Sequence, residues 1–568
     1  MGTVGAGGGF TMKAFARRLI PLSLALLLAG GAVAALGACG SSSTSTGGSS
    51  GSATGASSTP KKGGTLVFAW DSEPTTLDPA IAWNLIEWQI FHDVFANFYT
   101  YTAKPGTPGT QLEPAMATAM PTITNGGKTY TIRLKPGIKF QPPVNREVTA
   151  QDFKYSFERM MRLPLAPGTY FYTNVVGAPA YQAKKAAHIS GYKVLDKYTV
   201  QIDLSTPDLA FVNALTLDFC DPIPQEWVAK WGDAKVGRHP LGAGPFMFTG
   251  WTPGQQVTLA RNPNYGDAAN VWLDGIKFDL SLNPQIAYLR LQQGKVDVLG
   301  NNVPPADVVR VMNDPQWKPY VFQEPVVGTI YLFMNVQMKP LDNLKVRQAI
   351  SWAINRDKLV KLLGGQAQPL YQVYPPGMPG HQDGKQWYGY DPAKAKALLA
   401  EAGYPSGFTT VLGSDNVDPY PKLFQSIQAD LAAVGIKASL RIMANSTFQT
   451  YVSTPRTASI ARYLWYMDFP DPSDWVAPLF SKSAAVAGGT NNSYWWSPQL
   501  EQLLKEASPM TDPAARLAKY EEMQALIMDQ APYVTLYAPI MTTMSSKRVA
   551  GFYLHEVFTY DPVHYWLQ

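Results

Sequence analysis

The sequence predicts an α/β protein of two or three domains, and three observations lead to this expectation. A chain of 568 residues is too long for one hydrophobic core, because cores stop growing beyond about 250–300 residues. From Leu341 to about residue 530, helix signals alternate with a strand, an order typical of an α/β lobe. Between about residues 95 and 235, strand and helix patterns mix and carry their own apolar residues, which indicates a separate unit.

Short runs of β-branched and aromatic residues bounded by turn residues predict the strands. The run from Thr65 to Trp70 predicts a buried strand that opens the fold. Alternation of apolar and polar residues predicts further strands, half-buried where one face is polar. These are expected at 130–134, 200–204, 257–260 and 436–442.

Capping residues mark the expected helix starts. The segment from Thr149 to Asp152 resembles a capping box, and Phe153, Phe157 and Met160 follow at helical spacing. Asp391-Pro392 and Gly403 enclose a complete helix signature. Other helices are expected to start at Asp342 or Asn343, at Asp357 and at Asp512-Pro513. A further helix is expected over residues 421–434.

The N-terminal region reads as a lipoprotein signal peptide over residues 1–38. Lys13, Arg17 and Arg18 precede an apolar stretch that ends in Leu36-Gly37-Ala38-Cys39. This string resembles a bacterial lipobox, which implies cleavage before Cys39 and acylation of its thiol. The alternatives are an uncleaved membrane helix and a twin-arginine signal, and translation could start at Met12 as well as at Met1.

Residues 39–61 form an expected flexible tether, because positions 40 to 59 are Ser, Gly, Thr and Ala and cannot bury enough apolar surface to become ordered. A lipidated cysteine followed by such a tether indicates an extracytoplasmic body anchored to the cell membrane, on its periplasmic or cell-surface side. These features restrict the possible functions to capture of a solute, sensing of a ligand, or catalysis at the cell surface.

Several function classes are disfavoured by the sequence. The formal net charge is only +5 and no basic stripe occurs, so we expect no nucleic-acid partner. No Gly-x-Ser-x-Gly or His-Glu-x-x-His string is present, and the six histidines lack ligand-like spacing. Cys220 has no activating neighbour and reads as a buried small apolar residue. We therefore expect no catalytic residues, no metal site, no cofactor and no enzymatic activity.

A series of short strings along the body is informative when taken in order. They are Gly63 to Leu66, Leu77 to Pro79, Tyr130 to Phe140, Thr149 to Met161, Gly244 to Phe246, Asn262 to Tyr265, Phe333 to Asn335, Val346 to Arg356 and Tyr390 to Tyr404. Together they resemble the family 5 extracellular solute-binding proteins, the peptide- and nickel-type lipoproteins of ATP-binding-cassette (ABC) importers. The resemblance covers nearly the whole body, from about residue 62 to 565.

This resemblance implies a two-lobed, periplasmic-binding-protein-like (class II) flytrap with an extra α+β domain inserted in the first lobe. Such proteins close their lobes around a ligand. It further implies capture of peptides by a monomeric body and delivery to a membrane permease with its ATPase subunits. The implied boundaries are 62–95, 237–325 and 536–568 for lobe I, 96–236 for the inserted domain and 326–535 for lobe II.

Asp468 is the main candidate ligand-binding residue. It resembles the family carboxylate that pairs with the α-ammonium group of a peptide, and Trp465, three residues earlier, resembles an aromatic wall. A charge-assisted hydrogen bond of this kind contributes about 1.5–3 kcal/mol. Alternatively, Asp468, Asp471 and Asp474 are turn formers in a proline-rich loop.

Four further residues are candidates for ligand binding, and each also has an alternative structural role. Arg462 could bind the ligand carboxylate or form an internal ion pair, and Asn335 could bind ligand or hinge backbone. Tyr466 and Trp70, and likewise Trp465, could face the ligand or the core.

A receptor for varied peptides needs main-chain pairing as in strand addition, for which 71–75 and 464–468 are candidates. The same scaffold could bind an oligosaccharide, a metal chelate or haem, or act as a surface ligand sensor.

Overall fold

The computed structural model describes residues 59–164 and 166–568. The expected signal peptide, the acylated Cys39 and the tether up to residue 58 lie outside these described residues. None of the helices in the described ranges combines the length and apolar character needed to span a bilayer.

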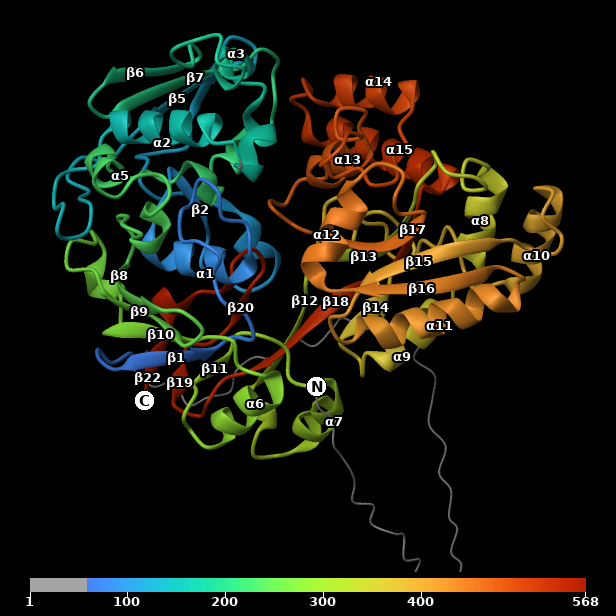
Figure 1. The fold of residues 1–568 in the computed structure, drawn as a ribbon. Helices are drawn as coiled ribbons and strands as arrows, with labels where there is room; N and C mark the ends of the chain where they lie inside the picture. Colours follow the sequence, from blue (N-terminus) through green and yellow to red (C-terminus); the bar gives the residue numbers. More distant parts are fainter. Residues whose placement is uncertain (1–58, 165) are drawn as a thin grey trace, which may run out of the picture. The chain divides into compact units, whose positions relative to one another are not determined.

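The first lobe is built on a five-stranded sheet with strand order β11-β1-β10-β9-β8 (Figure 1). The expected opening strand is present as β1, which pairs in parallel with both β10 and β11 because it lies between them. Its Leu66 and Phe68 are fully buried on one face, and Val67 on the other face is half-buried. The strands are β1 Thr65–Ala69, β8 Phe246–Thr252, β9 Gln256–Arg261, β10 Gly275–Asp279 and β11 Val298–Leu299, and the helices are α1 Leu85–Val94, α6 Pro284–Gln292 and α7 Pro305–Asn313.

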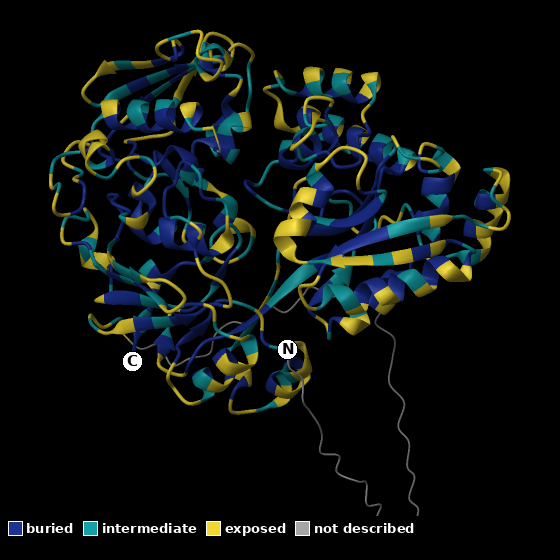
Figure 2. Cartoon of the chain, viewed as in Figure 1, coloured by how far each residue is buried: buried dark blue, intermediate teal, exposed yellow. Residues whose placement is uncertain are grey.

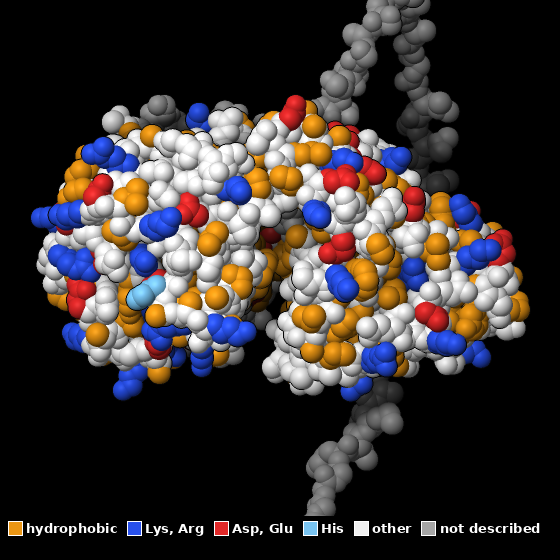
Figure 3. Space-filling view, turned by 90° about the horizontal axis from the view of Figure 1, so that it is seen from above, with side chains coloured by type: hydrophobic (Ala, Val, Ile, Leu, Met, Phe, Trp, Pro, Cys, Tyr) orange, Lys and Arg blue, Asp and Glu red, His pale blue; other side chains and the backbone are white. Residues whose placement is uncertain are grey.

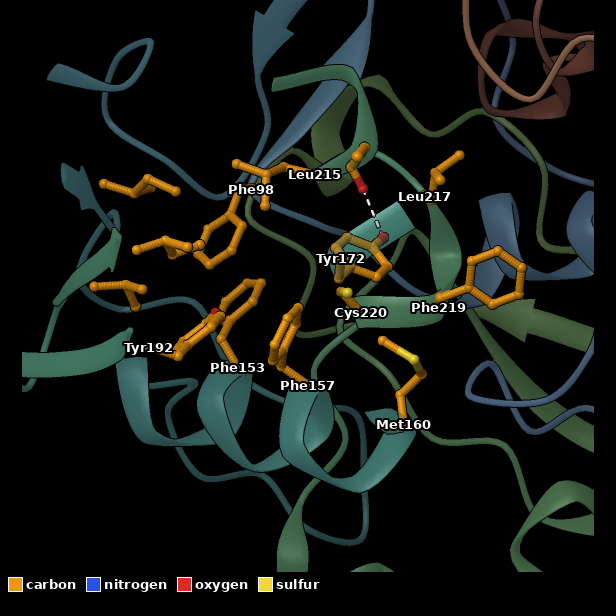
Figure 4. Close-up of a cluster of buried hydrophobic side chains, with 14 of the residues drawn as sticks. Phe98, Phe153, Phe157, Met160, Tyr172, Tyr192, Leu215, Leu217, Phe219 and Cys220 are labelled. Carbon is orange, nitrogen blue, oxygen red and sulfur yellow. Dashed lines mark hydrogen bonds between the residues drawn. The ribbon is translucent and has the colours of Figure 1, made fainter. Parts of the chain in front are cut away.

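A separate four-stranded antiparallel sheet, with order β4-β5-β7-β6, packs against α2. Thr149 caps α2 in a capping box with Asp152, as the sequence predicted. Phe153 and Phe157 project from α2 into an apolar cluster that also contains Cys220 (Figure 4). The elements are β4 Thr122–Thr124, β5 Thr129–Arg133, β6 Tyr192–Asp196, β7 Thr199–Asp203, α2 Ala150–Arg162, α3 Ala178–Gln182, α4 Phe211–Ala214 and α5 Gln225–Trp231, beside the hairpin of β2 Tyr99–Tyr101 and β3 Leu112–Pro114.

The second lobe is built on a seven-stranded sheet with order β12-β18-β13-β17-β15-β16, in which β14 also pairs with β18. All seven residues of its inner strand β13 are buried, whereas the outer faces of α10 and α11 are exposed (Figure 2). The strands are β12 Val321–Pro325, β13 Gly328–Met334, β14 Ala367–Pro369, β15 Thr409–Asp415, β16 Lys437–Met443, β17 Ile460–Tyr466 and β18 Tyr533–Met544.

The helices of this lobe largely begin where capping residues predicted them. Asn343 caps α8, Asp391 caps α10 and Asp512 caps α15 through side-chain hydrogen bonds. The expected start at Asp357 was wrong, because Asn355 accepts the capping hydrogen bond two residues earlier. The helices are α8 Leu344–Ala353, α9 Arg356–Leu362, α10 Pro392–Glu401, α11 Tyr420–Ala433, α12 Asn445–Ser453, α13 Ser473–Phe480, α14 Pro498–Ala507 and α15 Pro513–Gln530.

The strand β18 links the two lobes. Its first half pairs with β13 and β14, its second half pairs with β12, and Ser545 just beyond its end bridges to Val298 in β11. The chain then completes the first lobe with β19 Val549–Ala550, β20 Leu554–His555, β21 Thr559–Tyr560 and β22 Trp566–Leu567.

A buried ion pair ties α2 to the segment that precedes α1. The guanidinium of Arg159 donates two hydrogen bonds to Asp78, at 2.8 and 2.6 Å, and a third to Asp233 at 2.8 Å. Arg159 and Asp78 are both almost completely buried. Removing one partner of such a pair leaves a buried charge without its main counterion.

We expect Asp78→Ala to lower the free energy of unfolding by about 3–5 kcal/mol, because Arg159 would keep only Asp233. Urea denaturation followed by tryptophan fluorescence measures the change. Glu401→Ala, which breaks the solvent-exposed pair between Glu401 and Lys345, is the matched control and should cause no measurable loss. Equal effects of the two substitutions would contradict the assignment.

Candidate functional site

Two adjoining cavities, each of about 300 Å³, lie between α1 and β17. We call the first the strand cavity, because residues 462–468 line it, and the second the central cavity. Both share Leu85, Trp88, Tyr466, Met467 and Asp468 in their walls. Figure 3 shows the surface hollowed between the two lobes.

The wall formed by β17 has an open strand edge. It pairs with β13 along its whole length, but with β15 only at Ile460 and Ala461. The N–H of Met467 donates to the C=O of Val327, on the β13 side. Because backbone groups alternate between the two edges of a strand, Leu464 and Tyr466 direct their N–H and C=O groups toward the open edge. This edge can accept one more strand.

Asp468 lies just beyond the end of β17 and is 8% exposed. Its Oδ1 accepts a hydrogen bond from Nε1 of Trp83, at 3.2 Å, whereas its Oδ2 has no hydrogen-bond partner among the described residues. Desolvation by burial raises the pKa of this carboxyl group from 3.8 to about 7. The side chain is therefore a buried acid that still lacks a positive partner.

Asp474 and Asp471, the neighbouring acids, have different surroundings. Oδ2 of Asp474 accepts the backbone N–H of Asp468 at 2.9 Å, so Asp474 orients the main chain there. Burial and the nearby Asp468 raise the pKa of Asp474. Asp471 instead accepts two hydrogen bonds from Arg516, at 2.6 and 3.0 Å. Among the described residues, the charge of Asp471 is thus already compensated, and that of Asp468 is not.

Arg462 lines the strand cavity at the opposite end from Asp468. Its Nη2 donates to Asp415, and its guanidinium lies 3.8 Å from the ring centre of Tyr420. Its Nε and Nη1 have no hydrogen-bond partner in the described part of the chain. The internal ion pair considered from the sequence is present, and two donors remain unused.

Aromatic side chains close the cavities from both lobes. The rings of Trp83 and Trp465 meet edge to face, with centroids 6.3 Å apart. Tyr466 lines both cavities. Its ring packs so closely against Gly328 that a Cβ atom at position 328 would lie 2.5 Å from the ring. Trp70 lines the central cavity but is packed against Gly300 and is almost fully buried.

Two of the sequence candidates are not brought to these cavities. Asn335 is buried in a turn, where its Oδ1 accepts the N–H of Gln337 at 3.0 Å. Segment 71–75 lines neither cavity, and the N–H groups of Asp71 and Thr75 are bound by Asn301 and Glu87.

The sequence reasoning missed the wall that the first lobe contributes. Trp83, Leu85 and Trp88 surround the start of α1, and Leu85 is 64% exposed in spite of its apolar side chain. A helix start flanked by two tryptophans was the available signal, because exposed large apolar groups often mark binding surfaces.

Comparisons with known proteins find chains that are similar to this one over most of its length. Residues 111–486 match the model of the bacterial extracellular solute-binding proteins, family 5 Middle. The dipeptide-binding protein of Escherichia coli K12 is 30% identical over 453 residues, which cover 76% of this chain and 82% of that protein. Heme-binding protein A of Haemophilus influenzae is 28% identical over 516 residues, with coverages of 88% and 91%.

Solved structures show the same fold. The Helicobacter pylori periplasmic binding protein DppA, in complex with the peptide STSA, is 26% identical with a TM-score of 0.76, over 89% of this chain and 98% of that one. The clavulanic acid biosynthesis oligopeptide binding protein 2 is 23% identical with a TM-score of 0.83, over 89% and 96%.

We expect Asp468→Asn to stabilise the ligand-free protein by about 1–3 kcal/mol at pH 8 and to leave it unchanged near pH 4. The folded protein holds the Asp468 proton up to about pH 7, whereas the unfolded chain releases it from about pH 4. Wild-type stability therefore falls through this window. The variant loses only the part of this fall that comes from Asp468, because other buried acids such as Asp474 keep their raised pKa values.

Denaturation at the two pH values measures the difference, with Asp383→Asn on the exposed surface as the control. A variant that is less stable at both pH values would mean that the carboxylate already makes a favourable contact.

Proposed function

The chain belongs to family 5 of the bacterial extracellular solute-binding proteins, and on that basis we propose that it captures peptides with a free amino end between its two lobes. The observation that carries this proposal is Asp468, a buried carboxylate with one unused oxygen beside an open strand edge. The peptide would then pass to the permease of an ABC importer.

The amino end of the peptide binds at Asp468. An ammonium group there takes the free Oδ2 as acceptor and supplies the charge that the site lacks. Such a charge-assisted hydrogen bond contributes about 1.5–3 kcal/mol, and enclosure between the lobes reduces its screening by solvent. Trp83 and Trp465 enclose the site from opposite lobes.

The peptide main chain pairs with the open edge of β17. Leu464 and Tyr466 offer N–H and C=O groups in the spacing of a strand, so the ligand is held without reference to its side chains. With its amino end at Asp468 and its carboxylate at Arg462, the ligand runs antiparallel to β17. The two ends are up to about 20 Å apart, which an extended chain covers with about six residues.

Closure of the lobes completes the site. We assign lobe I to 62–95, 237–325 and 536–568, the inserted domain to 96–236, and lobe II to 326–535. These boundaries cut through the seven-stranded sheet, at β12 and within β18, because both strands pass between the lobes. The segments around β12 and β18 act as the hinge. Their pairing supports this role, because it joins the sheets of both lobes. The hydrogen bond from Trp83 to Asp468 spans the two lobes.

The N-terminal region anchors the protein. The lipobox string ending at Cys39 supports cleavage of residues 1–38 and lipidation of that cysteine. The Ser- and Gly-rich tether then holds a monomeric body near the membrane, within reach of the permease and ATPase subunits. In this role the protein binds and releases its ligand without chemical change.

Native mass spectrometry of the purified protein tests the ligand class. We expect a mixture of copurified short peptides, because main-chain pairing tolerates varied side chains. A single oligosaccharide, a haem or a metal chelate in place of peptides would overturn the proposal.

We expect Asp468→Asn to weaken binding of a free-amine peptide by about tenfold or more, and to leave binding of its N-acetylated form nearly unchanged. Titration calorimetry with alanine peptides of two to six residues provides the affinities, and the tightest binder becomes the reference peptide. Equal losses for both forms would make Asp468 a structural residue.

A parallel experiment tests the other end of the ligand. Arg462→Met should weaken a free-carboxylate peptide more than its C-terminal amide, since the unused guanidinium donors would be lost. Asp383→Asn serves again as the surface control. Should Arg462→Met affect the acid and the amide equally, Arg462 would serve only its ion pair with Asp415.

A further inference from the structure

The cleft continues from the central cavity into the first lobe. A third cavity of about 240 Å³, here called the side cavity, shares five residues with the central cavity. They are His92, Tyr101, Thr216, Asp218 and Phe558. A ligand group that enters the central cavity beside Asp468 can therefore extend toward Asp218 and beyond.

The walls of these two cavities carry acids and no basic side chain other than histidine. No lysine or arginine lines either cavity. Their acids are Glu113, Asp218, Asp221, Asp267, Asp468, Glu556 and Asp561. The two histidines of the side cavity, His92 and His564, both contact Asp561, at 3.2 and 2.7 Å, and are thereby engaged. Asp218 and Asp221 have no such partner among the described residues.

The position of Asp218 is fixed by the core beneath it. The apolar cluster of Figure 4 contains its neighbours Leu217, Phe219 and Cys220, so packing in the core fixes the backbone of this segment. Tyr172 in the same cluster donates a hydrogen bond to the C=O of Ala214, at 2.7 Å. With its neighbours held in the core, Asp218 faces the central and side cavities.

Asp221 adds a second carboxyl group to the side cavity. It is 2% exposed, and its Oδ2 has no hydrogen-bond partner in the described part of the chain. The hydroxyl group of Tyr99, which lines the same cavity, is also without a partner there. Desolvation raises the pKa of Asp218 to about 7 and also raises that of Asp221, where the nearby Asp218 adds to the effect. The two carboxyl groups thus have each other, and no lysine or arginine, as neighbours, and the unpartnered oxygen of Asp221 is available to a cationic group.

We propose that Asp218 and Asp221 form a subsite for the cationic side chain of the first residue of the bound peptide, a lysine or an arginine. This inference rests on the proposed function. The first residue is the one whose side chain can reach Asp218, because its amino group binds at Asp468 and both acids line the central cavity. The later residues lie along 462–465, which line only the strand cavity.

An organic cation fits this subsite better than a metal ion does. Within residues 59–164 and 166–568, no group of three or more His, Cys, Asp or Glu side chains is arranged to hold a metal. A lysine ammonium or an arginine guanidinium instead needs one or two carboxylate acceptors, which Asp218 and Asp221 supply. The long apolar stem of either side chain would pass Tyr101 and Phe558.

The test compares peptides that differ only in their first residue. The reference peptide is made with lysine, norleucine or glutamate at position 1, and also with lysine moved to position 2. We expect the lysine-1 form to bind at least about tenfold more tightly than the norleucine form, and the glutamate form to bind most weakly. Moving the lysine to position 2 should remove the advantage.

Variants then locate the effect. Asp218→Asn should reduce the preference for lysine over norleucine to less than about threefold. Asp383→Asn, on the exposed surface, should preserve the full preference. Asp221→Asn provides a second variant in case Asp218→Asn does not fold.

The outcomes separate this inference from the proposed function. If the alanine peptides bind but lysine at position 1 gives no advantage to the wild-type protein, the subsite is wrong and the peptide function stands. If no peptide binds at all, the proposed function itself fails. A preference that survives Asp218→Asn and Asp221→Asn would place the cation elsewhere.

Discussion

Burial of a carboxylate without a counterion is the constraint on which the proposed binding site depends. Asp468 is desolvated by the two lobes, accepts one hydrogen bond from Trp83, and keeps Oδ2 without a partner among the described residues. Burying a charge in this way costs free energy that the rest of the fold must offset. A cation in the cleft removes that cost, so the geometry favours occupancy by a positively charged group.

The remaining parts of the cleft follow from which backbone and side-chain groups are left free. β17 has one open edge because β15 diverges from it after Ala461, and Arg462 keeps two unused donors at the far end. The two ends of the cleft carry charges of opposite sign. Acids surround the central cavity, and the guanidinium of Arg462 lines the strand cavity. A zwitterionic, extended ligand matches this polarity and a neutral sugar does not.

Local signals made parts of this structure predictable, and long-range packing determined the rest. The capping box at Thr149 and the helix that begins after Asp391 follow from neighbouring residues, and both were predicted correctly. The prediction at Asp357 was wrong because Asn355, two residues earlier, is also a favourable capping residue and is the one that caps α9. Trp83 and Asp468 are 385 positions apart, so no local pattern could show that they meet. The family resemblance singled out Asp468, but only the fold shows which of its oxygens is free.

The shared strand β18 has a consequence for the biogenesis of the protein. Because this strand pairs within the second lobe and Ser545 beyond it bridges to β11, a nascent chain that ends before residue 533 lacks a strand of one lobe and the closing segment of the other. Contacts of such long sequence separation form slowly. The second lobe therefore completes its sheet, and the first lobe its closing segment, only after the C-terminal segment has been synthesised.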